Sequence, residues 1–531
     1  MKRILLILSA IAFFCLQITT KLFAAGILVS IPFLVYFAIK RPELAAPRTM
    51  NRVGKGFCAL TAMGICLWPI ANFAAWLRSI TVFQQFQHFA GIEAVLLSQA
   101  AAVITAVAGL LFVYQMVCLF YERFFAIVRT VIRDFSRDEG IAAAATAAVF
   151  VVLVVIVYSH TDAFANPLVK RDLIYMSDSG AIVHENAYLS LSALENDIRS
   201  PLFALFAAPL LGLPYLISRI LPVPNAEGIV MVAAQAPLLV ASFCLLMKLI
   251  RGTGKATRLV LPVMLLATYS SLLFTVMAEQ YTVALFYLLL GLYSLLKHGR
   301  REPMLILGAA GTMPPGAALA LVPEPKREKW PDVFRNALHS GLQGIVLLCT
   351  LGSFGVVLRI PDTLHSIGRF SGEGITFQEK LRQFLSFTGQ IFVAPHAGES
   401  FAADGYAKWR LMDTGGVSIP GIMLLILACA GFVCNRKQIF ARISMLWVAL
   451  SFLLLGVIGW GAMENGMTLY TLYFGWAYAV LLVYLVESLM RRIKLGKFSW
   501  LVYVLGTAAL LWYNLPPLRE MIAFAYTYYP V

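Results

Sequence analysis

The feature that most constrains this fold is a series of long apolar runs. The run "IAAAATAAVFVVLVVIVY" (141–158) carries no charge, and "PGIMLLILACAGFVC" (420–434) is nearly as long. A helix of about 20 apolar residues crosses a hydrocarbon core of about 30 Å. A helix on the surface of a soluble protein would instead carry polar residues every three or four positions. The sequence therefore predicts an all-α, polytopic membrane protein with amphipathic helices in its loops.

The charge of the chain fits the same class. The net charge is +15, and the Lys and Arg residues gather in short clusters between apolar runs, as in cytoplasmic loops of membrane proteins. No basic domain stands apart from the apolar runs, so we expect no nucleic-acid partner. The eight cysteines lie in or beside apolar runs and form no CxxC pair, so the sequence indicates neither a disulfide framework nor a zinc site.

The basic clusters predict about thirteen spans, because each cluster must be an even number of crossings from the one before it. They also predict an extracytoplasmic C-terminus. The predicted spans lie near 4–19, 22–39, 57–77, 91–119, 141–158, 229–247, 259–277, 282–296, 341–358, 418–434, 443–460, 467–488 and 498–515.

Two further apolar segments are predicted not to cross. If 201–224 crossed, the next span would deliver the cluster "KLIRGTGKATR" to the outside, so this proline-rich segment is expected to be interfacial or re-entrant. The run "MLILGAAGTMPPGAALALV" (304–322) lies between two basic clusters and is broken by Pro314 and Pro315. It predicts a re-entrant hairpin or a pair of half-helices.

Two outer loops stand out by size, 159–200 and 359–417, and both show helical periodicity. The apolar positions predict helices that lie flat on the outer leaflet; they are Tyr188, Leu191, Leu194 and Ile198 in the first loop and Phe377, Leu381, Phe384 and Leu385 in the second. The predicted domains are a four-span extension (1–139), a catalytic module (140–358), the second outer loop (359–417) and a four-span C-terminal region (418–531).

The first outer loop holds the densest set of ionisable residues outside the spans. Asp178 precedes a Ser-Gly turn signal just above the fifth span, and His184 and Glu185 follow within two turns. A carboxylate beside apolar surface is suited to act as a general base, whereas the alternatives are a turn-capping Asp and a solvated loop face. The downstream group Glu195, Asp197 and Arg199 is expected to organise the return to the membrane, with Pro201 in the first helical turn and Asp197 or Ser200 near the cap.

Further candidates lie in other outer turns and in the second outer loop. Glu279 with Gln280, and Glu464 with Asn465, lie in short outer turns at membrane depth. An acidic residue at that depth is a candidate for function, and the alternative is that these are residues of an interfacial loop. Cations of the second outer loop are candidates for gripping a phosphate or for attraction to anionic headgroups; we single out Arg359, Arg369 and His396.

The order and sidedness of these features resemble the GT-C superfamily of membrane glycosyltransferases, which use polyprenyl-phosphate-linked sugars. The resemblance spans about 140–515 and rests on "SDSGAIVHENAY" (177–188), "NDIRSPLFALFAAPLLGLP" (196–214), "AEQYTVALFYLLLGLYSLL" (278–296) and "ENGMTLYTLYFGWA" (464–477). It implies that Asp178 is the catalytic base, with Glu185 in reserve, and that Glu279 is the second acidic residue of the site. Two departures are the four preceding spans and the lack of a paired Asp-Glu or Asp-Asp after the span.

The resemblance further implies a bacterial inner-membrane enzyme of the cell envelope with an extracytoplasmic site. Its partners would be a polyprenyl-phosphate sugar donor, a glycan or lipid acceptor, and membrane lipids; whether a divalent cation takes part is left open. One alternative is a polysaccharide polymerase or ligase, which would depend on Arg359, Arg369 and His396. The other is a lipid-linked sugar flippase or transporter, which should place ionisable residues within its spans.

Overall fold

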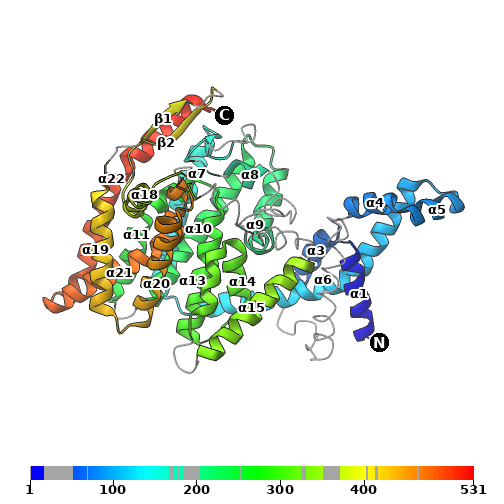
Figure 1. Cartoon of the computed structure of the whole chain (residues 1–531), viewed down its shortest axis with the longest axis horizontal. Coiled ribbons are helices and arrows are strands. Elements are labelled where there is room, and N and C mark those ends of the chain that lie inside the picture. Colours follow the sequence, from blue (N-terminus) through cyan, green and yellow to red (C-terminus); the bar gives the residue numbers. More distant parts are fainter. Residues whose placement is uncertain are drawn as a thin grey trace. The chain divides into compact units, whose positions relative to one another are not determined.

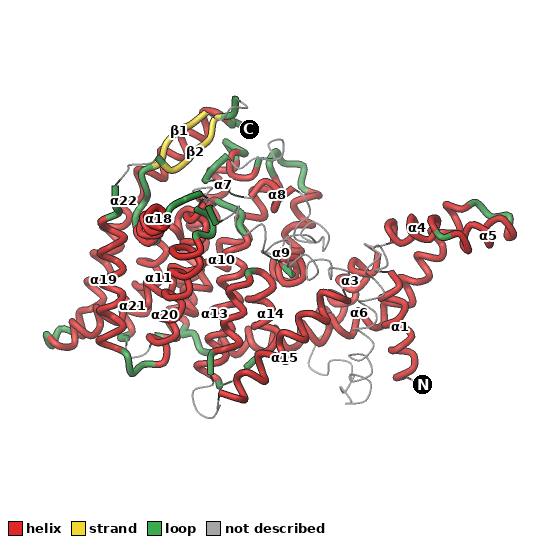
Figure 2. Tube along the Cα trace, viewed as in Figure 1, coloured by secondary structure: helices red, strands yellow, loops and turns green. Residues whose placement is uncertain are grey.

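The prediction of an all-α polytopic protein is confirmed in a computed structural model of the chain (Figures 1 and 2). Among the described residues, eight helices are long and apolar enough to cross a membrane, or nine if one bent pair counts as a span, against about thirteen predicted. The structure describes residues 2–16, 52–67, 70–166, 173–175, 177, 179–184, 200, 202–250, 253–299, 301–323, 330–350, 371–372, 374–401, 405–412, 416–462 and 466–531. The predicted span at 22–39 lies outside these residues.

The chain divides into two compact units. The first comprises Met1–Phe135 with Leu338–Arg359, and the second Ser136–Ala337 with Ile360–Val531. The helix α15 (Trp330–Thr350) passes from the second unit into the first. The other helices of the first unit are α1 (Lys2–Leu16), α3 (Arg52–Leu67), α4 (Ile70–Ser79), α5 (Thr81–Ala90) and α6 (Ala94–Arg133).

The helices α1, α3 and α4 of the first unit pack against the 40-residue helix α6. Gly109 of α6 allows close approach, because a Cβ there would lie 3.0 Å from the backbone of Phe13, and the Ser9 hydroxyl accepts a hydrogen bond from the Phe112 amide. Of the predicted span at 57–77, the structure describes 57–67 in α3 and 70–77 in α4.

The second unit is a helical bundle. Its helices are α7 (Arg137–Tyr158), α8 (Ser179–His184), α9 (Phe203–Ile220), α10 (Ala226–Leu249), α11 (Lys255–Leu266), α12 (Tyr269–Val276), α13 (Gln280–His298), α14 (Pro303–Thr312), α18 (Phe377–Gln390), α19 (Ile419–Asn435), α20 (Ile439–Ser451), α21 (Thr471–Arg492) and α22 (Ser499–Tyr528). We call the end where α7 stops and α10 starts the Tyr158 end. The opposite end, where Lys248 of α10 pairs with Glu139 of α7 at 2.6 Å, is the Lys248 end.

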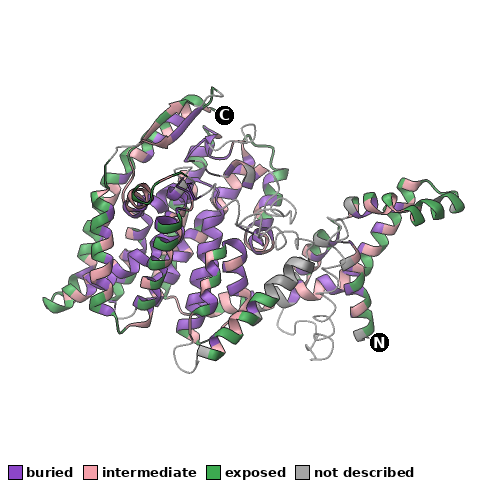
Figure 3. Cartoon of the chain, in the orientation of Figure 1, coloured by how far each residue is buried: buried purple, intermediate pink, exposed green. Residues whose placement is uncertain are grey.

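The centre of this bundle is formed by α13 and α21, which are buried along most of their length (Figure 3). α21 packs closely against α19 at Gly431, where a Cβ would lie 2.1 Å from the Leu481 carbonyl oxygen. The Asn435 side chain then donates to the Tyr484 carbonyl at 3.0 Å and joins the same two helices near the Lys248 end. The lack of a side chain at residue 431 thus sets the distance between the helices.

The predicted hairpin at 304–322 is confirmed. The helix α14 is followed by a 3₁₀ helix, η2 (Pro314–Leu321), which packs back against it. The Arg301 guanidinium donates to the carbonyls of Ala320 and Val322 at 2.7 and 2.6 Å, so the hairpin returns to the level at which it began. Pro314 starts the returning arm, as a proline in the first turn of a helix can.

Two helices lie across the bundle rather than along it. Figure 1 shows α9 and α18 close to end-on, whereas α10, α13 and α19 run up the view. The amide of Leu202, before α9, donates to Gly311 at the tip of α14, and Arg219, in its last turn, pairs with Glu227 in the first turn of α10. Both ends of α9 therefore lie toward the Tyr158 end, which agrees with the expectation that 201–224 does not cross, although α9 is long and apolar enough to do so.

Ser200, one of the two caps predicted for this helix, does not cap it: the N-cap of α9 is Leu202, which makes no side-chain hydrogen bond. The other predicted cap, Asp197, and Pro201 lie outside the described residues. The second flat helix is present: α18 begins with a Thr376 cap. Its buried face differs from the predicted one, because Phe384 and Phe387 are buried whereas Phe377 is exposed. The predicted helix at 188–198 lies outside the described residues.

The predicted span at 259–277 is broken. α11 and α12 meet at a 65° bend at Ala267 and Thr268. The buried Asn514 of α22 donates to the carbonyls of Ala267 and Phe392 at 3.0 and 2.8 Å and accepts from the Ala394 amide. One side chain thus satisfies backbone groups at the bend and in the second outer loop.

We predict that Gly431→Ala destabilises the protein by about 1 to 3 kcal/mol, because the added methyl group collides with the backbone of α21. Thermal unfolding in detergent checks this, with Gly140→Ala as the control. Gly140 has nothing within 4 Å of the added methyl group, and Ala favours the helix there by up to about 1 kcal/mol. Equal unfolding midpoints for the two variants would contradict the packing argument.

Candidate functional site

The candidate residues from the sequence divide into two sets. Those outside the described residues are Asp178, Glu185, Glu195, Asp197, Arg199, Arg359, Arg369, Glu464 and Asn465. The structure describes His184, Glu279, Gln280 and His396, and all four lie at the Tyr158 end of the second unit. The Ser-Gly pair predicted as a turn instead begins the short helix α8 at Ser179.

Glu279 is buried where the chain turns from α12 into α13. Glu279 is 1% exposed. It occupies the N-cap position of α13, where its side chain makes no capping hydrogen bond. Gln280, the first residue of α13, is also buried. The Tyr158 hydroxyl donates to the Val276 carbonyl at 2.8 Å and fixes this turn against the end of α7. The structure thus holds a carboxylate inside the protein at the end where the outer loops gather.

The two large outer loops contact each other at this end. The second loop forms an antiparallel hairpin of β1 (Ala397–Phe401) and β2 (Ala407–Leu411) (Figure 2). Trp409 of β2 forms a parallel bridge with Ile174 of the first loop: its amide donates to the Leu173 carbonyl at 2.8 Å, and its carbonyl accepts from Tyr175 at 3.0 Å. His396, just before β1, is exposed.

A buried hydrogen-bonded trio fixes this contact to the bundle. The hydroxyl groups of Tyr175 and Tyr269 lie 2.6 Å apart, and the Trp409 indole donates to Tyr175 at 3.3 Å. Burial raises the pKa of Tyr175 to about 12, against the opposing effect of the two hydrogen bonds, so the phenol is neutral at physiological pH. Tyr175 also has a φ of +50°, which non-glycine residues seldom adopt and which the surrounding contacts maintain.

The C-terminus returns to the same end. Thr161 forms a bridge with Pro530, and its hydroxyl donates to the carbonyls of Ala525 and Tyr529 at 3.0 and 2.6 Å. The Val531 amide donates to the His160 carbonyl. The first outer loop, the second outer loop and the C-terminus therefore lie on one side of the bundle, as the charge-based topology requires.

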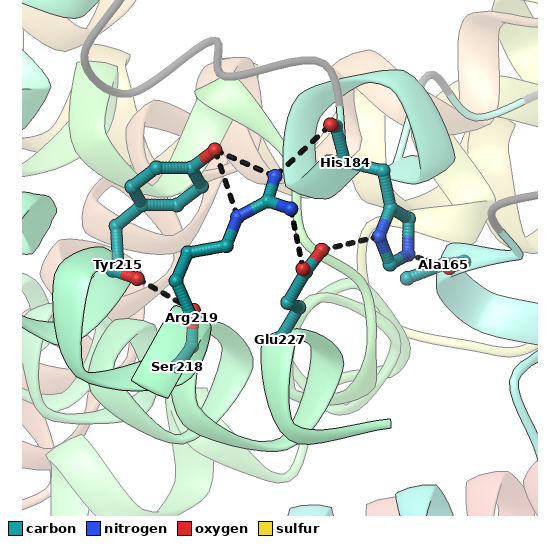
Figure 4. Close-up of polar contacts among 6 residues, drawn as sticks. All are labelled: Ala165, His184, Tyr215, Ser218, Arg219 and Glu227. Atoms are coloured by element: carbon teal, nitrogen blue, oxygen red, sulfur yellow. Dashed lines mark hydrogen bonds and ion pairs between the residues drawn. The ribbon is translucent and has the colours of Figure 1, made fainter. Parts of the chain in front are cut away.

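A polar cluster at the α9–α10 turn holds His184 (Figure 4). The His184 Nδ1 lies 2.5 Å from Glu227 Oε2, and its Nε2 lies 2.6 Å from the Ala165 carbonyl oxygen. Arg219 pairs with the other oxygen of Glu227 at 2.6 Å and donates to the His184 carbonyl at 3.1 Å. The same guanidinium donates from Nε and from one terminal nitrogen to the Tyr215 hydroxyl.

This geometry occupies both ring nitrogens of His184. Neither is available to take a proton from a substrate, so in this arrangement the ring holds α8 in place. Asp162 lies close enough to interact electrostatically with His184; its pKa is raised by burial, an effect that the hydrogen bond from Asn166 and the charge of His184 oppose. Among the residues that the structure describes, no three His, Cys, Asp or Glu side chains could together hold a metal ion.

Sequence reasoning missed Arg219 and Glu227. The available signal was their position: they are the only charged residues between 203 and 247 and flank the proline-rich turn that joins two apolar helices. An ionisable residue at such a position needs a partner. The pairing of Arg219 with Glu227 across the turn could have been predicted from their positions. The third residue of the cluster, His184, lies 35 residues before Arg219 in the sequence.

Removing the Tyr269 hydroxyl should weaken the attachment of the outer loops. We predict that Tyr269→Phe costs about 1 to 3 kcal/mol, because the buried Tyr175 hydroxyl loses its short hydrogen bond. Thermal unfolding and hydrogen exchange of the 397–411 hairpin measure the effect. Tyr473→Phe is the matched control, since no group among the described residues forms a hydrogen bond with the buried Tyr473 hydroxyl. Equal losses of stability in the two variants would contradict this role.

In comparisons with known proteins, no family model, no curated protein and no solved structure matches the chain.

Proposed function

We propose that the chain is an integral-membrane glycosyltransferase that moves a sugar from a polyprenyl-phosphate donor to a glycan or lipid acceptor. The observation that carries the proposal is the buried carboxylate of Glu279 at the end of the bundle where both outer loops dock. Holding an ionisable group inside an apolar bundle costs free energy, and such residues are typical of functional sites. We place the site on the extracytoplasmic face of a bacterial inner membrane.

The proposed chemistry needs a base and a stabilised leaving group. An acceptor hydroxyl loses its proton as it attacks the anomeric carbon, while the lipid phosphate departs. We assign the base to Asp178, directly before α8, with Glu185 in reserve and Glu279 as the second acidic residue. The cations of the second outer loop, Arg359 and Arg369, are assigned to the phosphate.

The apolar surface at the Tyr158 end suits a lipid-linked substrate. α9 lies across the bundle and exposes the apolar side chains Leu213, Leu216, Ile217 and Ile220. On the other flat helix, α18, Phe384 and Phe387 are buried, while an Arg382–Glu379 ion pair lies on the more polar side. Such helices hold apolar faces at the level of lipid headgroups, where a polyprenyl chain and its phosphate meet.

The decisive experiment is sugar transfer from a radiolabelled polyprenyl-phosphate hexose by the purified protein in lipid nanodiscs, with water as the default acceptor. We predict that Glu279→Gln and Asp178→Asn each lower turnover by about 10²-fold or more, since each removes a carboxylate from the site. Glu520→Gln, the same change at an exposed carboxylate of α22, should leave turnover unchanged. Wild-type turnover in both site variants, or none in the wild type, would reject the proposal.

The sidedness has its own test. We predict that a cysteine introduced by His396→Cys reacts with a membrane-impermeant maleimide in intact cells. The native Cys434 is exposed near the C-terminus of α19, at the Lys248 end, and should react only after the membrane is opened. Labelling of Cys434 in intact cells, with no labelling at residue 396, would place the Tyr158 end in the cytoplasm.

A further inference from the structure

The short helix α5 of the first unit has an apolar face that the described residues leave uncovered. We propose that this face lies in lipid at the boundary of the membrane, so that α5 is an interfacial helix that anchors the first unit. The partner is the lipid surface itself, bound through apolar contacts and without a charged headgroup. The inference concerns the first unit alone and stands whether or not the chain transfers sugars.

The sequence of α5, TVFQQFQHFA, separates apolar from polar side chains around the helix. At 3.6 residues per turn, Val82, Phe86 and Phe89 fall within an arc of about 60°. Gln84 and His88 project from the opposite side of the helix. This division is typical of a helix that lies along a boundary between an apolar and a polar phase.

The apolar face of α5 is not part of the core of the first unit. Val82, Phe86 and Phe89 are 72, 57 and 91% exposed. The hydrophobic core of the unit, as far as the structure describes it, is built from α1, α3, α4 and α6, and no residue of α5 contributes to it. Figure 3 accordingly shows most of α5 as exposed. Three large apolar side chains on one face indicate contact with an apolar surface outside the chain.

The adjoining span identifies that surface as lipid. The apolar window of α6, Ala94–Cys118, begins with the first residue of the helix, four residues after α5 ends. Leu96 and Ile104 in this window are exposed apolar side chains, as on the lipid-facing side of a spanning helix. Since Glu93 directly precedes the window, the hydrocarbon boundary lies at this end of α6, beside α5. The apolar face of α5 therefore continues the lipid-facing surface of α6.

The turns at the two ends of α5 separate it from its neighbours. At its start, the Gln84 side chain donates to the Arg78 carbonyl in the last turn of α4 at 2.8 Å. At its end, Gly91 has a φ of +65°, a conformation that favours glycine and that ends a helix. The chain can therefore leave α5 along the boundary and enter α6 across the membrane.

The charge pattern indicates that α5 binds lipid without electrostatic attraction. Between Arg78 and Glu93 the chain carries no Asp, Glu, Lys or Arg. Interfacial helices that are attracted to anionic headgroups carry Lys or Arg on their polar face, whereas the polar face of α5 carries glutamine and His88. Apolar contact is thus the interaction that holds α5 in lipid, and a neutral bilayer should suffice.

Spin labels on the full chain in lipid nanodiscs test the assignment. They are attached to cysteines introduced by Phe89→Cys on the apolar face or His88→Cys on the polar face, in a Cys434→Ser background because Cys434 is exposed. We expect oxygen, which concentrates in lipid, to relax the label at residue 89, and a water-soluble nickel chelate to relax the label at residue 88. Leu96→Cys in α6 is the lipid reference.

Two results would overturn the proposal. Equal access of the nickel chelate to residues 88 and 89 would mean that water covers both faces of α5. A label at residue 89 that neither reagent reaches would mean that a second copy of the chain or another protein covers the apolar face.

Lipid composition tests how α5 is held. The ratio of oxygen to chelate relaxation at residue 89 should be the same in nanodiscs of phosphatidylcholine alone and in nanodiscs that also contain phosphatidylglycerol. Lipid contact that appears only with phosphatidylglycerol would overturn the assignment to apolar contact.

A double variant tests the role of the two phenylalanines, with the label moved to Val82→Cys. Phe86→Gln with Phe89→Gln should lower the ratio of oxygen to chelate relaxation at residue 82 several-fold, because α5 then leaves the lipid. The unfolding midpoint should stay unchanged, since neither side chain belongs to the core. Gln85→Ala with His88→Ala is the matched control on the polar face and should keep residue 82 in lipid. A label that stays in lipid in the phenylalanine variant would also overturn the proposal.

Discussion

The structure depends on satisfying backbone groups wherever a helix inside the bundle breaks or turns. In an apolar environment a carbonyl without a donor costs several kcal/mol, so a break persists only where a side chain reaches it. Asn514 supplies the donors at the bend between α11 and α12, Tyr158 at the turn before Glu279, and Arg301 at the end of η2. These three donor residues lie in different parts of the chain, so each break is attached to another part of the bundle.

These ties explain why the Tyr158 end collects the outer loops. Asn514 joins the α11–α12 bend to the segment that leads into the β-hairpin. Tyr269, the first residue of α12, contacts the first loop through Tyr175. The hairpin then contacts the first loop directly through Trp409. The two outer loops are therefore attached to α12, the helix that leads to the turn carrying Glu279.

The sequence predicted elements whose signal is local. The proline pair at 314–315 between two basic clusters predicted the hairpin, and the spacing of Phe377, Leu381 and Phe384 predicted the amphipathic helix α18. Continuity of spans was less predictable: the 259–277 run is mostly apolar, yet it is divided between α11 and α12. Apolar composition favours a membrane environment but does not encode a bend when a distant side chain stabilises it.

By itself, the sequence determined the fold class, the grouping of the outer loops on one side and the flat helix α18, because hydropathy and charge act on each segment separately. Only the tertiary structure decided the partners of the polar residues. The sequence placed His184 among the candidate residues of the first outer loop, and the folded chain shows that its ring contacts Glu227 and Ala165. Partners brought together from α8, α9 and α10 depend on how the helices pack, and no periodicity in the sequence specifies that.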